Sequence, residues 1–167
     1  TGMRSKLPLG DADVELNVNL LRRVKPHQIF AAGDLSDPHD THRLCLDAIK
    51  AALKAVRRES WFKDCYVWFY RGAWEEWEIE QIDMAVPLSP DESQAKRLAI
   101  YRHQSQKDKA MFPGPYDSRE FWQRSEDRNQ ETARQYDLLG LPEYHAIEAF
   151  VRYPLKMAAQ TASQMEG

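Results

Sequence analysis

One stretch constrains the fold of this chain more than any other: a short apolar run, then a polar loop, then a long segment with helical spacing. Residues 28–32 (Gln-Ile-Phe-Ala-Ala) are predicted to form a buried strand, and residues 33–43 form a loop rich in His and Asp. Residues 44–56 repeat apolar side chains with the period of a helix. Open α/β sheets place their ligand sites where a strand leads through a loop into a helix. The pattern therefore predicts an α/β fold with a ligand site at residues 33–43.

Two histidines in this loop, His39 and His42, lie three residues apart, with Asp34, Asp37 and Asp40 close to them. Imidazole and carboxylate groups together can hold a metal ion or transfer protons. The alternative is a helix cap, in which Asp37 or Asp40 accepts backbone N–H bonds and the histidines are merely exposed. The spacing alone leaves both interpretations open, because two histidines at this separation occur by chance in many chains.

The complete segment 25–43, Lys-Pro-His-Gln-Ile-Phe-Ala-Ala-Gly-Asp-Leu-Ser-Asp-Pro-His-Asp-Thr-His-Arg, resembles a known motif. It is similar to the second metal-site segment of the PIG-L/LmbE family of zinc-dependent N-acetylglucosaminyl deacetylases. It most resembles the version found at the C-terminus of long glucosamine-6-phosphate deaminase-like (isomerase-like) proteins. The resemblance implies that His42 binds zinc and that His39 assists the substrate or the oxyanion. Asp40 and Thr41 stand where the family commonly has Pro and Asp.

A second element extends the resemblance, which covers about residues 13–153. Residues 102–106, Arg-His-Gln-Ser-Gln, are similar to the family's His-x-Ser-Gln element at the end of a helix. Arg43 is predicted to point at the same site from the first turn of its helix. In the predicted site, Asp37 and His39 are the catalytic residues and His42 is the metal ligand. The substrate-binding residues are Arg43, His103 and Gln106.

The family's first motif, His-Pro-Asp-Asp followed by an acidic residue, is absent, and no His-Pro dipeptide occurs in the sequence. In the family this motif supplies the other zinc ligands and the general base, so the isolated chain is expected to have little or no deacetylase activity. We interpret residues 1–153 as the C-terminal portion of a PIG-L-like domain and residues 154–167 as a flexible tail. The resemblance implies a Rossmann-like three-layer α/β/α fold with a partly parallel sheet, truncated at its N-terminal side.

Two functions follow from the resemblance. The first is part of a zinc-dependent amide hydrolase that removes the N-acetyl group of an amino sugar or a related amide, linked to glucosamine-6-phosphate metabolism; the small-molecule partner would be an amino sugar or a sugar phosphate. The second is a non-catalytic packing or assembly module of a deaminase- or isomerase-like protein. Both imply the N-terminal remainder of a parent protein as a partner, with zinc in the complete domain and not necessarily in this chain. Truncation would expose apolar surface, which predicts a homo-oligomer.

The amino-acid composition limits the classes of protein to which the chain can belong. Apolar residues make up 43% and charged residues 29% of the 167 residues, which is typical of a globular protein. The net charge of −3 provides no broad basic field for nucleic acid or an anionic membrane. The sequence has no apolar run long enough to span a bilayer, and its two cysteines fit a reducing cytoplasm. We therefore expect a cytoplasmic protein with a small-molecule ligand.

The remaining segments predict further elements. Helices are expected at residues 11–24, from about 91 to 106, at 119–139 and at 143–151, with a second buried strand at 64–71 and a turn at 87–90. Residues 74–84 are predicted to form a strand or sheet edge, with their four glutamates on its wet face: Glu75, Glu76, Glu78 and Glu80. The helix at 44–56 has one solvent-facing charged stripe, interpreted as structural: Arg43, Asp47, Lys50, Lys54 and Arg57.

Overall fold

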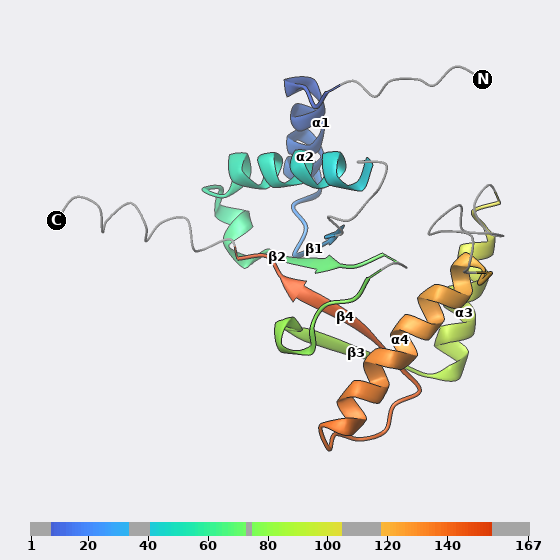
Figure 1. The fold of residues 1–167 in the computed structure, drawn as a ribbon. Helices are drawn as coiled ribbons and strands as arrows, with labels where there is room; N and C mark the ends of the chain where they lie inside the picture. The colour runs from blue at the N-terminus through green and yellow to red at the C-terminus, as the bar shows by residue number, and fades with distance from the viewer. Residues whose placement is uncertain (1–7, 34–40, 73–74, 105–117, 155–167) are drawn as a thin grey trace. The chain divides into compact units, whose positions relative to one another are not determined.

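The computed structural model describes residues 8–33, 41–72, 75–104 and 118–154 (Figure 1). The chain divides into two compact units, the first comprising residues 1–68 and 153–167 and the second residues 69–152. Three of the predicted site residues, Asp37, His39 and Gln106, lie outside the described residues. The prediction of a flexible tail at 154–167 also lies outside them, except for Pro154.

The first unit is a strand–helix–strand arrangement preceded by a helix. In chain order it contains α1 (Asp11–Val24), β1 (Gln28–Ala32), α2 (Thr41–Val56), the 3-10 helix η1 (Ser60–Asp64) and the start of β2 (Tyr66–Tyr70). The backbone N–H of Tyr66 donates to the carbonyl of His27 at 2.8 Å. Because this bond joins the residues at the start of both strands, β1 and β2 run parallel, with α2 as the crossover between them.

Helix α2 carries the core of this unit. Its side chains Leu46, Leu53 and Val56 are buried, and their spacings of seven and three residues place them on one stripe. Ala48 and Ala52 are also buried. Both α1 and β1 pack on α2 (Figure 1). The apolar period of α2 therefore positions α1 and β1 in the first unit.

Helix α1 ends where the sequence predicts. Lys25 adopts the left-handed conformation, with φ 48° and ψ 57°, and its N–H donates to the carbonyl of Leu21 at 2.8 Å. This is the usual way to satisfy a carbonyl in the last turn of a helix. Pro26 follows, and a proline has no N–H with which to extend the helix. The chain then turns directly into β1.

The second unit contains the end of β2, the 3-10 helix η2 (Ile79–Gln81), β3 (Met84–Leu88), α3 (Pro90–Tyr101), α4 (Phe121–Leu138) and β4 (Ala146–Arg152). Strands β3 and β4 pair antiparallel, with Val86 opposite Glu148. Helix α4 packs on β4, and α3 packs on both α4 and β3. Ser89 caps α3 through two reciprocal hydrogen bonds. The Ser89 hydroxyl accepts from the backbone N–H of Glu92 at 3.3 Å, and the Glu92 carboxylate accepts from the backbone N–H of Ser89 at 2.8 Å.

Three predictions for the second unit are wrong. A strand or sheet edge was predicted at 74–84, but residues 75–83 form irregular backbone and η2. The predicted turn at 87–90 overlaps β3. The predicted helix at 143–151 is strand β4. In β4 the apolar pairs 146–147 and 149–150 are all buried, with a polar residue between them. A strand covered on both faces loses its period of two, and this spacing imitates a helix.

The α/β class and the partly parallel strand arrangement are confirmed, since the described strands include a parallel and an antiparallel pair. The predicted three-layer arrangement stays a prediction. None of the helices in the described part of the chain is long and apolar enough to cross a bilayer.

The role of α2 in the first core can be tested with Leu53, whose side chain is 1% exposed. We expect Leu53→Ala to lower the free energy of unfolding by about 2–5 kcal/mol, because it removes buried methyl groups and leaves a cavity. The matched control is Leu16→Ala on α1, where the side chain is 70% exposed and the loss should stay within about 0.5 kcal/mol. Urea denaturation measures both, and equal losses would contradict the assignment of the core.

Candidate functional site

His42 and Arg43 lie in the first turn of α2, and both side chains are exposed. The helix begins at Thr41, three residues earlier than the apolar period predicted. Seven undescribed residues separate this turn from the end of β1. The structure therefore places His42 at the start of the helix that follows strand β1 in the chain.

His103 lies just beyond α3 and is exposed, with its backbone N–H donating to the carbonyl of Ile100 at 2.9 Å. It belongs to the second unit, whereas His42 and Arg43 belong to the first. Their convergence on one site stays a prediction. Among the residues that the structure describes, no three His, Cys, Asp or Glu side chains gather in a way that could hold a metal ion.

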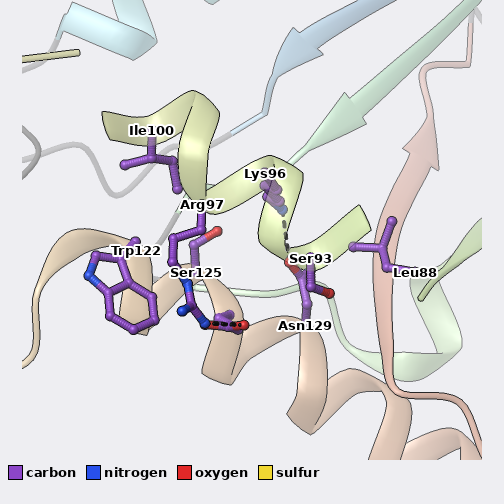
Figure 2. A pocket seen from close by; sticks show the side chains of 9 residues that line it. Leu88, Ser93, Lys96, Arg97, Ile100, Trp122, Ser125 and Asn129 are labelled. Atoms are coloured by element: carbon purple, nitrogen blue, oxygen red, sulfur yellow. Dashed lines mark hydrogen bonds and ion pairs between the residues drawn. The ribbon is translucent and has the colours of Figure 1, made fainter. Parts of the chain in front are cut away.

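A buried polar network, which the sequence analysis missed, joins α3, α4 and β4 in the second unit (Figure 2). Asn129 is only 1% exposed, and its amide nitrogen donates to the carbonyl of Ile147 at 2.9 Å. Its amide oxygen accepts from Lys96 Nζ at 2.8 Å, and Lys96 also pairs with Glu148 at 3.0 Å. Lys96, Asn129 and Glu148 thus each have a hydrogen-bonding or charged partner within the network.

A second pair lies beside this network. The Arg97 guanidinium binds the Glu126 carboxylate at 2.6 and 2.8 Å and lies 3.9 Å from the ring centre of Trp122. The hollow between these side chains and their neighbours has a volume of about 10 Å³ (Figure 2). That is the room needed by about one water molecule. The network is therefore a polar core between α3, α4 and β4, and the hollow inside it is too small for a metabolite.

A third cluster corrects the interpretation of the acidic run at 75–80. The Arg128 guanidinium donates to the backbone carbonyls of Arg71, Gly72 and Glu75, with the first of these at 2.6 Å. It also lies 3.3 Å from the carboxylate of Glu76. Glu76 is therefore packed against a cation and is not on the wet face of an edge strand. Burial raises the pKa of the Glu76 carboxyl, although the Arg128 charge opposes this effect.

The sequence contained a usable signal for the polar core of the second unit. Ser125, Asn129 and Thr132 are buried and recur on α4 at spacings of four and three residues. A stripe of small polar residues at helical spacing on a highly charged helix marks its buried face. The prediction for this helix rested only on its charged residues. No local pattern marks Arg128, because its partners lie more than 50 residues away in the chain.

The fold and the exposed histidine at a strand-to-helix connection define an α/β protein with a candidate ligand site on α2. Comparison with known proteins adds a more particular relationship. The chain is 60% identical, over 155 residues, to a glucosamine-6-phosphate deaminase-like protein of Bacteroides thetaiotaomicron. This match covers 92% of the chain but only 23% of the length of that relative. No family model matches the chain. The similarity thus links the chain to one part of a glucosamine-6-phosphate deaminase-like protein.

The partly buried position of Glu76 predicts a pH dependence of stability. Because its pKa is higher in the folded chain than in the unfolded chain, the folded state holds this proton more tightly. The stability that Glu76 contributes is present below its ordinary pKa and is lost as the pH rises through the folded value. We therefore expect Glu76→Gln to be at least as stable as the wild type at pH 7, with its advantage vanishing toward pH 4.5.

Glu131→Gln serves as the control, because its stability relative to the wild type should change with pH in the opposite direction. Hydrogen bonds from Arg134 and Gln135 lower the pKa of the exposed Glu131, so Glu131→Gln should lose stability at pH 7 and recover it at low pH. Chemical denaturation of the three proteins across this pH range measures both trends. A Glu76→Gln variant that is less stable than the wild type at pH 7, with a deficit that shrinks on acidification, would contradict the account of Glu76.

Proposed function

We propose that this chain is one portion of a longer glucosamine-6-phosphate deaminase-like protein, to which it contributes part of a zinc-dependent amide-hydrolase site for N-acetylated amino sugars. The observation that carries the proposal is the 60% identity to a relative of that name over 92% of the chain. The resemblance of residues 25–43 and 102–106 to the deacetylase motifs gives the proposal its chemistry. The chain alone is expected to have little or no activity.

The position of His42 fits this role. Its imidazole is exposed in the first turn of α2, where the crossover helix begins after strand β1. Parallel strands followed by crossover helices place ligand sites at the carboxyl ends of the strands. An exposed neutral imidazole is a good zinc ligand. Arg43, the next residue, adds a fixed positive charge that can hold an anionic group of a substrate.

His42 alone does not make a zinc site, because a catalytic zinc needs three protein ligands and one open position. Bound zinc would lower the pKa of a water molecule and polarise the acetamide carbonyl. In the proposed site, His42 is one ligand, and Asp37 and His39 are the nearby catalytic candidates. His103 and Gln106 would bind the substrate. The remaining ligands would come from the longer protein, which supplies what the absent first motif does in the family.

A second candidate function is a non-catalytic packing module, and one observation favours it. Helix α1 has a second apolar stripe that is exposed: Leu16 by 70%, Leu20 by 47% and Val24 by 59%. Exposed apolar side chains at spacings of four residues mark an interaction surface. Since the chain corresponds to 23% of the length of its relative, we propose the remainder of the longer protein as the occupant of this stripe. A homo-oligomer through the same stripe is the competing outcome, which sedimentation of this chain at high concentration would reveal.

Metal content tests the proposed site. In the longer protein we expect stoichiometric zinc after dialysis, which His42→Ala removes because it deletes a ligand. His145→Ala, which changes another exposed histidine just before β4, should retain the zinc. The isolated chain should hold no stoichiometric zinc. Elemental analysis decides between the outcomes: zinc retained in His42→Ala would contradict the assignment of this ligand.

Acetate release tests the reaction itself. We expect the longer protein to hydrolyse the N-acetyl group of N-acetylglucosamine 6-phosphate, and His42→Ala to reduce the rate by at least about 100-fold. His145→Ala should leave the rate unchanged. A longer protein that binds no zinc and releases no acetate would overturn the enzyme proposal and leave the packing module as the function.

A further inference from the structure

The first unit contains a hollow that neither the motifs nor the relative accounts for. Its volume is about 350 Å³, which falls in the range of small-molecule sites. It lies along the C-terminal half of α2, beside the residues that follow β4. Its walls combine cationic, apolar and aromatic side chains: Lys50, Ala51, Leu53, Lys54, Arg57, Tyr153 and Pro154.

The walls of this groove are fixed by the core of the unit. Lys50 and Lys54 lie four residues apart on one face of α2, and Arg57 directly follows the end of this helix at Val56. Leu53, at the floor of the groove, is 1% exposed. On the other side, the backbone N–H of Tyr153 donates to the carbonyl of Val67 in β2 at 2.9 Å. The groove is therefore built on a helix and on a residue anchored to a strand.

The charge of the groove is of one sign. Among the described residues that line it, three are cationic and none is a carboxylate. Elsewhere in the same unit a cation is matched by an acid, as in the 2.8 Å pair of Arg22 with Glu59. Lys54 and Arg57, by contrast, form no ion pair with any residue in the described ranges. Cations gathered around one hollow repel each other, and a bound anion removes that repulsion.

The remaining lining residues narrow the kind of anion. Ala51, Leu53 and Pro154 give the groove an apolar floor, and the half-buried Tyr153 offers a ring and a hydroxyl. A compact inorganic anion would leave this surface uncovered. Arg57 can bind a phosphate group with two parallel hydrogen bonds, while Lys54 acts as a point charge. A phosphate monoester with an uncharged, sugar-sized body matches both parts of the groove.

We propose that this groove binds the phosphate monoester of a small metabolite, with Lys54 and Arg57 on the phosphate and Tyr153 against the body. The stripe that the sequence analysis interpreted as purely structural thus includes a binding surface. The groove is distinct from the predicted zinc site. Lys50 lies 8 residues beyond His42 on the same helix, about 12 Å along its axis, and Arg57 lies just past the end of that helix. The proposal therefore does not rest on the proposed hydrolase function.

Binding to the 167-residue chain tests the proposal without any assay of activity. The probes for titration calorimetry are glucose 6-phosphate, inorganic phosphate and glucose. We expect glucose 6-phosphate to bind most tightly, inorganic phosphate at least about tenfold more weakly and glucose not measurably. Lys54→Ala and Arg57→Ala should each weaken glucose 6-phosphate at least about tenfold, as expected for loss of a charge-assisted bond. The control Lys63→Ala removes an exposed cation of the same unit that does not line the groove, and it should change nothing.

Tyr153 separates recognition of the body from recognition of the phosphate. Tyr153→Ala should weaken the binding of glucose 6-phosphate without affecting the binding of inorganic phosphate. Tyr153→Phe should retain the contact between the ring and the body of the ligand. Circular dichroism confirms that each variant is folded. No binding of glucose 6-phosphate at millimolar concentration would overturn the proposal. Equal weakening by Lys54→Ala and Lys63→Ala would also overturn it, because the binding would then reflect general surface charge.

Discussion

The first unit depends on the burial of one face of helix α2. Leu46, Leu53 and Val56 are removed from water there, and each contributes about 1.5–3 kcal/mol of transfer free energy. Helix α1 and strand β1 are held through contacts with this helix. Because the buried stripe fixes the rotation of α2, it also fixes where the polar residues of the same helix point. The two candidate sites of this unit, His42 at one end and the cationic groove at the other, both depend on that packing.

The second unit is organised on a different principle. Its helix α4 presents small polar side chains to the core, and Asn129 connects Lys96 of α3 to the backbone of β4. Buried polar groups of this kind are costly when a partner is missing, so they specify one arrangement of the helices. Arg128 does the same for Arg71, Gly72 and Glu75 by donating to their backbone carbonyls. These interactions give structural partners to Lys96, Glu148, Arg128 and Glu76 of the second unit.

Much of the first unit could be predicted from the sequence because its signals are local. The apolar periods of residues 11–24 and 44–56 and the short run at 28–32 each lie within a single element. The second unit was harder, since strand β4 is buried along both faces and shows no alternation. The buried state of Glu76 depends on Arg128, and the groove on α2 depends on Tyr153, about 100 residues from Lys54. No local pattern encodes such long-range pairings, and the motif segments 25–43 and 102–106 do not contain these residues.

The account's central claim is that this chain works as one portion of a longer protein. Hydrogen–deuterium exchange of α1 tests it most directly, because the exposed stripe of Leu16, Leu20 and Val24 should be covered in the longer protein. We predict that the amides of α1 exchange at least about tenfold more slowly there than in the isolated chain, with strand β4 as the internal reference. Equal exchange rates of α1 in the two proteins would contradict the claim that the remainder packs on this helix.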